Sequence, residues 1–229
     1  MSTTAKKKPP LRRPDAVMAA ELQNKRRRLS WLLSGAAAVV ALVVLYAVFS
    51  TSPAKSTAGS GTSYDVGSPG IGRTAPAFKL AASTGKQVGL SDFRGKNVLL
   101  YFQEGLTCQP CWDQLTALEK AAARVKAAGV DEIVSITTDP VDLITRKTKD
   151  MSLTTPVLSD PDLKVSRQYG ANEYGMMGSS RDGHSFLLVG PDGTIRWRAD
   201  YGGAPDYTMF VAVDKLLADL KAGAGVRSS

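Results

Sequence analysis

The chain has 229 residues, a hydrophobic content of 43% and a formal net charge of +8. This length accommodates one sizeable domain with extensions, and the positive charge alone would suit a nucleic-acid-binding protein. However, residues 1–29 hold nine Lys or Arg against two acidic residues, whereas the rest of the chain holds 20 basic against 19 acidic residues. The basic character therefore belongs to the tail, which argues against nucleic acid as a partner of the folded part.

The first fifty residues combine a basic segment with an apolar one. Residues 30–50 carry no charged side chain, and about 20 apolar residues suffice for a helix to cross a bilayer. Trp31 and Tyr46 stand near the two ends of this segment, and the basic run 25–28 precedes it, which predicts a cytoplasmic N-terminus. We therefore expect a basic cytoplasmic tail at 1–29, a single-pass transmembrane helix at 30–50 in a bacterial cell membrane, and an extracytoplasmic remainder. A cleaved signal peptide is the alternative.

After the apolar segment the composition changes again. Residues 51–72 are rich in Ser, Gly and Thr and predict a flexible linker. The predicted domain covers 73–222, and 223–229 form a C-terminal tail. Within the domain, strand and helix signals alternate, which predicts an α/β class with a central mixed sheet flanked by helices on both faces. The expected strands are 77–80, 87–90, 97–103, 132–136, 157–158, 184–189 and 194–197. The expected helices are 108–128, 140–150, 161–169 and 207–222.

The chain contains two cysteines, Cys108 and Cys111, in a C-x-x-C spacing where the expected helix 108–128 begins. Unpaired N–H groups and the positive dipole end at a helix N-terminus stabilise a thiolate. Pro110 suits the first turn, because the N–H that it lacks would have no partner there. A disulfide that closes so small a loop restricts the unfolded chain little. The pattern therefore favours a redox pair over a structural disulfide, and an oxidising compartment would suit it.

Several stretches of the chain, in this order, carry a family resemblance. They are GRTAPAFKL (72–80), LSDFRGK (90–96), CQPCW (108–112), LSDPD (158–162), FLLV (186–189) and DG (192–193). Together they resemble the thioredoxin superfamily, in particular its redoxin branch, which includes the AhpC/TSA peroxiredoxins and membrane-tethered thioredoxin-like proteins of bacteria. The resemblance covers about 70–200. It implies a thioredoxin-like fold and redox chemistry at the cysteine pair, for which no dissociable cofactor is needed.

The chain departs from the peroxiredoxin motif at two positions. Peroxiredoxins place Pro-x-x-x-Thr-x-x-Cys around the peroxidatic cysteine. If Cys111 takes that role, Cys108 stands at the threonine position and Glu104 at the proline position. A nearby carboxylate would disfavour a thiolate, so these departures favour disulfide exchange over peroxide reduction. Thioredoxin-like proteins usually also have a cis-proline before the strand that corresponds to 186–189, where it faces the cysteine pair. Residues 182–185 contain no proline, so the resemblance does not extend to this element of substrate docking.

His184 is the one histidine of the chain. One interpretation makes it a residue packed at a strand edge near the cysteines. The other interpretation rests on a resemblance to Sco-type copper chaperones. In these proteins two cysteines and a histidine bind copper, and this set of ligands suits the metal. Those families usually space their cysteines C-x-x-x-C. Zinc would require a fourth ligand, for which the chain has no further Cys or His.

Other side chains near the cysteine pair have structural interpretations. We expect Trp112 to cover the start of the helix as core packing. Glu104 and Asp113 flank the pair and are expected to be solvated surface acids, with a proton relay as the alternative. The segments 201–203 and 207–210 are expected to dock the final helix, although they could line a groove beside the cysteines.

The sequence therefore predicts a membrane-tethered extracytoplasmic thiol–disulfide oxidoreductase. Cys108 would attack a partner protein, and Cys111 would resolve the mixed disulfide. Its partners would be protein disulfides or dithiols and a redox partner. The alternatives are a thiol peroxidase with Cys111 peroxidatic and Cys108 resolving, a copper chaperone that uses Cys108, Cys111 and His184, and a redox-inactive adaptor with a structural disulfide.

Overall fold

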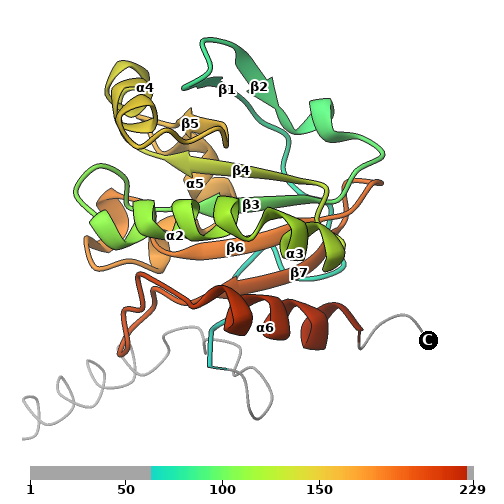
Figure 1. Cartoon of the computed structure of the whole chain (residues 1–229). Coiled ribbons are helices and arrows are strands. Elements are labelled where there is room, and N and C mark those ends of the chain that lie inside the picture. Colours follow the sequence, from blue (N-terminus) through green and yellow to red (C-terminus); the bar gives the residue numbers. More distant parts are fainter. Residues whose placement is uncertain (1–62, 226–229) are drawn as a thin grey trace, which may run out of the picture. The chain divides into compact units, whose positions relative to one another are not determined.

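The computed structural model describes residues 63–225 (Figure 1). The predicted tail at 1–29 and the predicted transmembrane helix at 30–50 lie outside the described residues. Within 63–225, no helix is both long enough and apolar enough to cross a membrane.

The described residues form a seven-stranded sheet with the order β2-β1-β5-β4-β3-β6-β7 (Figure 1). The central strands β3, β4 and β5 run parallel, whereas β6 and β7 on one side and β1 and β2 on the other pair antiparallel. The predicted mixed sheet is therefore confirmed. The strands are β1 (Lys79–Ala82), β2 (Gln87–Gly89), β3 (Val98–Phe102), β4 (Glu132–Thr137), β5 (Val157–Ser159), β6 (Ser185–Val189) and β7 (Ile195–Asp200).

Helices cover both faces of the sheet, as predicted. In Figure 1, α2, α3 and α6 lie in front of the sheet and α5 lies behind it. The helices are α2 (Gln109–Lys120), α3 (Ala122–Ala127), α4 (Val141–Asp150), α5 (Lys164–Gln168) and α6 (Val213–Gly225). Short 3-10 turns are η1 (Leu90–Phe93), η2 (Ala171–Glu173) and η3 (Gly178–Ser180).

Strand β3 divides its side chains between two hydrophobic clusters. Leu99 and Tyr101 join the cluster that contains the buried side chains of α2 and α6. Val98, Leu100 and Phe102 join the cluster on the other face. Since side chains alternate along a strand and both faces are covered, the strand reads as a continuous apolar run. This central, doubly buried strand leads directly into the loop before Cys108.

Two predicted helices differ from the observed ones. The helix expected over 108–128 is interrupted at Ala121, whose backbone angles of φ −98° and ψ 17° leave the helical region. The helix expected over 207–222 begins only at Val213. Tyr207 has a positive φ of 43°, and Met209 and Val211 are buried without being helical. The apolar spacing was misleading because this non-helical segment also packs against the domain.

The predicted linker 51–72 extends too far, because 64–72 pack against β7. The backbones of Asp65 and Asp200 exchange hydrogen bonds of 3.0 and 2.9 Å. Gly67 N–H donates to Asp200 Oδ2 at 2.7 Å. Arg198 pairs with Asp200 at 2.7 Å and donates to the Pro69 carbonyl at 3.1 Å. A buried ion pair in β7 therefore fixes a segment whose small residues alone suggested flexibility.

Candidate redox site

The two cysteines form a disulfide at the start of α2, with their Cα atoms 5.4 Å apart. Cys108 is the N-cap residue, and Pro110 lies in the first turn, where its missing N–H costs no hydrogen bond. The Cys111 N–H donates to the Sγ of Cys108 at 3.3 Å. Cys108 is 6% exposed and Cys111 is fully buried. A first-turn N–H and the positive end of the helix dipole therefore act on the sulfur of the more exposed cysteine, where they would stabilise a thiolate.

Cys111 lies among apolar and aromatic side chains. Met209 forms a small buried cluster with the two cysteines. The Tyr101 hydroxyl donates to the Cys111 carbonyl at 3.3 Å and lies 3.4 Å from His184 Nδ1. Phe186 stacks on Tyr101 with a centroid distance of 4.4 Å and an interplanar angle of 5°. These contacts enclose Cys111 in a low-dielectric environment.

His184 is fully buried just before β6 and contacts the rings of Tyr101, Phe186 and Tyr201. Burial lowers its pKa to about 3, although the backbone of Met209 opposes this shift. The imidazole is therefore neutral at physiological pH, as a packed residue should be. Within the described part of the chain, no three His, Cys, Asp or Glu side chains are arranged to hold a metal ion. The geometry thus gives no support to the copper alternative.

Glu104 differs from its expected role as a solvated acid. Glu104 is only 4% exposed. Its side-chain oxygen Oε1 accepts hydrogen bonds from the backbone N–H groups of Met176 at 2.5 Å and Met177 at 3.3 Å. It is buried because the segment that contains these methionines folds against it. Asp113 is exposed as expected, and it accepts a hydrogen bond from Gln109 Nε2 at 2.8 Å.

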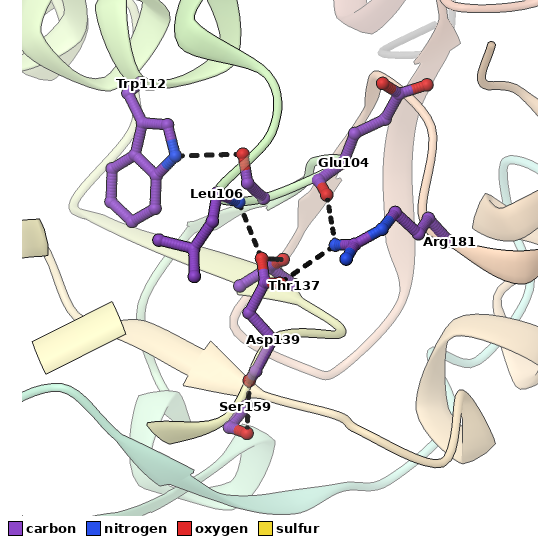
Figure 2. Close-up of polar contacts among 8 residues, drawn as sticks. Glu104, Leu106, Trp112, Thr137, Asp139, Ser159 and Arg181 are labelled. Carbon is purple, nitrogen blue, oxygen red and sulfur yellow. Dashed lines mark hydrogen bonds and ion pairs between the residues drawn. The ribbon is translucent and has the colours of Figure 1, made fainter. Parts of the chain in front are cut away.

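A polar cluster around Asp139 was missed by the sequence reasoning (Figure 2). The Asp139 carboxylate accepts hydrogen bonds from Leu106 N–H at 2.6 Å and Thr137 Oγ1 at 3.1 Å, and it pairs with Arg181 at 2.9 Å. The same Arg181 nitrogen donates to the Glu104 carbonyl at 3.0 Å. One local signal was the Asp-Pro pair after β4, a strand that lies beside β3 in the sheet.

Trp112 is fully buried, which agrees with the expected core packing. Its indole N–H donates to the Gly105 carbonyl at 3.0 Å, so the ring also holds the loop before the cysteines (Figure 2). Lys147 of α4 also contacts this region. Its Nζ donates to Gln109 Oε1 at 2.9 Å and lies 5.8 Å from the centroid of the Trp112 ring. A cation from α4 is therefore held beside the first turn of α2.

Contacts of the segments 201–203 and 207–210 reach both the final helix and the cysteines. The Tyr201 hydroxyl donates to Asp219 in α6 at 2.7 Å and so docks the final helix. Met209 instead packs against the cysteines. Next to it, Tyr207 and Phe210 are 43% and 44% exposed.

Residues 182–185, where the expected proline is missing, are held by internal contacts. Gly183 N–H donates to the Ala171 carbonyl at 2.9 Å, and His184 N–H donates to the Tyr174 carbonyl at 2.8 Å. Asp182 is fully buried, and burial raises its pKa well above the usual range, an effect that Ser166 opposes. This segment therefore contributes a buried carboxyl group and a neutral imidazole to the interior.

Comparisons with known proteins agree with this architecture. The AhpC/TSA family pattern matches residues 71–198. Over 127 residues, the chain is 36% identical to Peroxiredoxin Bcp of Escherichia coli (strain K12), an alignment that covers 54% of this chain and 81% of that protein. Over 101 residues it is 33% identical to the thiol-disulfide oxidoreductase ResA of Bacillus thuringiensis, which covers 44% of this chain and 57% of that protein.

Solved structures show the same fold. Peroxidoxin BcpB from Mycobacterium tuberculosis superimposes with a TM-score of 0.55 at 23% identity, covering 66% of this chain and 96% of that one. AhpC from Enterococcus faecalis gives a TM-score of 0.57 at 18% identity, covering 68% and 93%. With the family pattern extending over more than half of its length, the chain belongs to the AhpC/TSA family and is a thioredoxin-fold oxidoreductase.

Proposed function

We propose that this domain catalyses thiol–disulfide exchange with protein partners, with Cys108 as the attacking thiolate and Cys111 as the resolving one. The observation that carries the proposal is the disulfide at the start of α2, in which Cys108 is 6% exposed and Cys111 is fully buried. Thr107, Gln109 and Pro110 around Cys108 are exposed, whereas Cys111 is enclosed. A partner therefore reaches Cys108 first.

The exchange proceeds in two balanced steps. The Cys108 thiolate attacks one sulfur of a partner disulfide, and the other partner sulfur leaves as a thiolate that takes up a proton. Cys111 then loses its proton and attacks Cys108 Sγ, which releases the second partner thiol. The partner disulfide gains two electrons, and the domain returns to the disulfide form seen in the structure. The reverse sequence would oxidise a partner dithiol.

Peroxide reduction is the second candidate, because a relative at 36% identity is named a peroxiredoxin. In that reaction Cys111 would attack the peroxide and Cys108 would resolve the sulfenic acid. Two features of the site count against it. Cys111 is fully buried, and the position at which the motif has a threonine is occupied by Cys108, which leaves no hydroxyl there to orient a peroxide.

A trapping experiment separates the two candidates. In the full chain, Cys111→Ser should accumulate a mixed disulfide on Cys108 when it is mixed with a disulfide-bonded protein such as insulin, and Cys108→Ser should not. The wild-type chain should reduce insulin disulfides when dithiothreitol is supplied. Failure to trap any species, together with rapid peroxide consumption that persists in Cys108→Ser, would reject exchange in favour of peroxidase activity.

We also propose that the domain works outside the cytoplasm, tethered by the apolar segment 30–50. Support comes from the sequence alone: an uncharged stretch of sufficient length follows the basic run 25–28. Protease added to intact cells with a permeabilised outer layer should digest the domain while a cytoplasmic marker survives. Recovery of the intact chain in the cytosolic fraction would contradict the tether.

A further inference from the structure

One peptide unit, between Gly105 and Leu106, is held at both ends directly before the cysteines. Its carbonyl oxygen, on Gly105, accepts hydrogen bonds from Cys108 N–H at 2.9 Å and from the Trp112 indole at 3.0 Å. Its N–H, on Leu106, donates to Asp139 Oδ2 at 2.6 Å. Because a peptide unit is planar, Asp139 sets the direction of the carbonyl that receives the Cys108 N–H.

This peptide unit needs an external restraint because it begins at a glycine. Gly105 has a φ of +85°, a region that side chains rarely adopt, and a Cβ at this position would overlap the Asp139 carboxylate. Glycine gives a backbone access to several conformations at little cost. If the peptide turned over, its carbonyl would leave Cys108, and its N–H would leave Asp139.

Arg181 holds Asp139 in place and fixes the preceding peptide as well. Its Nη1 donates to Asp139 Oδ1 at 2.9 Å and to the Glu104 carbonyl at 3.0 Å (Figure 2). The Asp139 side chain is 5% exposed and that of Arg181 is 27% exposed, so solvent screens the pair little. The Glu104 carboxylate in turn binds the N–H groups of Met176 and Met177. Two segments far apart in the sequence thus restrain each other.

We propose that Asp139 and Arg181 are positioning residues for Cys108. They hold the Gly105–Leu106 peptide in one orientation, so that Cys108 stays at the N-cap and its sulfur keeps the hydrogen bond from Cys111 N–H. That N–H stabilises a thiolate more than a neutral thiol. The pair therefore lowers the proton affinity of Cys108 and makes the disulfide easier to reduce. The inference rests on the proposed function, in which Cys108 is the reacting sulfur.

The test uses the full chain with Asp139→Asn or Arg181→Gln. In the Cys111→Ser background, the rate of Cys108 alkylation by iodoacetamide is followed from pH 5 to pH 10. We expect each variant to react about threefold to tenfold more slowly at pH 7, with the midpoint of the pH profile moved upward by roughly half a unit to one unit. With both cysteines present, equilibration with glutathione should show the disulfide about threefold to tenfold more stable, where tenfold corresponds to about 30 mV.

The control is Asp142→Asn, which breaks an Asp–Arg pair of the same 2.9 Å length on the exposed surface of α4. It should leave the pH profile and the glutathione equilibrium unchanged. Arg181→Lys, which keeps the charge, should recover part of the wild-type profile. Thermal unfolding is measured for every variant.

Unchanged alkylation and an unchanged glutathione equilibrium in folded Asp139→Asn and Arg181→Gln would overturn the proposal. An unfolded Arg181→Gln chain would also overturn the proposal, because the ion pair would then be required for the stability of the whole domain and not specifically for the position of Cys108. Both readouts work without a protein partner. A chain that fails to trap insulin but shows the expected shifts would reject the proposed function and retain the positioning role of the pair.

Discussion

The two cysteines, although three residues apart, are held by different kinds of interaction. Cys108 follows a loop fixed by directional hydrogen bonds and the Asp139–Arg181 ion pair. Cys111 is fully buried, Tyr101 donates to its carbonyl and is itself stacked on Phe186, and Met209 packs against both cysteines. Directional bonds fix the orientation of a sulfur while leaving a path to it, whereas apolar packing removes a sulfur from solvent. The difference suits a pair in which one sulfur reacts with the partner protein and the other resolves the mixed disulfide from inside the domain.

The largest effect on stability is expected from the aromatic packing behind the cysteines. Phe186 is fully buried and stacks on Tyr101, so Phe186→Ala should lower the free energy of unfolding by about 3–5 kcal/mol. Urea denaturation followed by fluorescence measures the loss. Phe210→Ala is the matched control, because Phe210 is 44% exposed and should change stability by about 0.5 kcal/mol or less. Equal losses at the two positions would contradict the buried packing described for Phe186 and Tyr101.

A smaller loss of stability, accompanied by a change in reactivity, is expected on the Cys108 side. Gly105→Ala places a methyl group against Asp139 at a φ of +85°, whereas Gly85→Ala in the β1–β2 turn has a φ of +79° with open space around it. Both variants bear the strain of a positive φ, roughly 1–2 kcal/mol. Gly105→Ala alone also disrupts buried hydrogen bonds, so its total loss in the free energy of unfolding should be about 3 kcal/mol. Urea denaturation measures both losses, and the Cys108 alkylation rate should fall in Gly105→Ala alone.

The fold was largely predictable because its elements have local signals. Alternation of apolar strands with amphipathic helices gave the mixed sheet, and the C-x-x-C spacing after a buried strand placed the cysteines at a helix start. The same signals failed where apolar residues pack without regular structure, as at Met209, and where the helix breaks at Ala121. Periodicity reports burial, and it does not distinguish a helix from an irregular segment that packs equally well.

The polar half of the site could not be predicted, because its contacts join residues that are distant in the sequence. Arg181 lies 42 residues after Asp139, and Glu104 lies 72 residues before Met176. An acidic residue in a loop is usually solvated, so nothing local indicated that Glu104 would be buried. A glycine three residues before Cys108 was a weak signal of close backbone packing, and only the structure shows what it approaches.

Two buried titratable residues beside the site should act on stability with opposite pH dependence. The pKa of His184 is lowered to about 3, so from about pH 6.5 downward the unfolded chain binds a proton that the folded chain does not. The free energy of unfolding then falls as the pH falls. The pKa of Asp182 is raised well above 3.8, so above about pH 4 the unfolded chain loses a proton that the folded chain keeps. Its contribution falls as the pH rises.

Variants separate these two slopes. Urea midpoints measured between pH 4 and pH 6.5 should rise less steeply with pH in His184→Phe than in the wild-type chain. They should rise more steeply in Asp182→Asn, where the opposing contribution is removed. The slope with pH, and not the absolute stability, is the quantity to compare, because both substitutions also change packing. Identical slopes in the three proteins would show that neither residue is titrated by unfolding.

The smallest effect concerns the cation beside the first turn of α2. Lys147 is held against Gln109 and the Trp112 ring, so its charge should favour the Cys108 thiolate. Lys147→Ala, in the Cys111→Ser background, should slow Cys108 alkylation at pH 7 by about twofold, the size expected of a partly exposed charge. The control is Lys149→Ala, which removes an exposed charge on the same helix. Since salt screens such interactions, the difference between the two variants should shrink as sodium chloride is raised. A twofold difference that is insensitive to salt would mean that Lys147 acts through its hydrogen bond to Gln109, which would extend the directional contacts of the Cys108 side to α4.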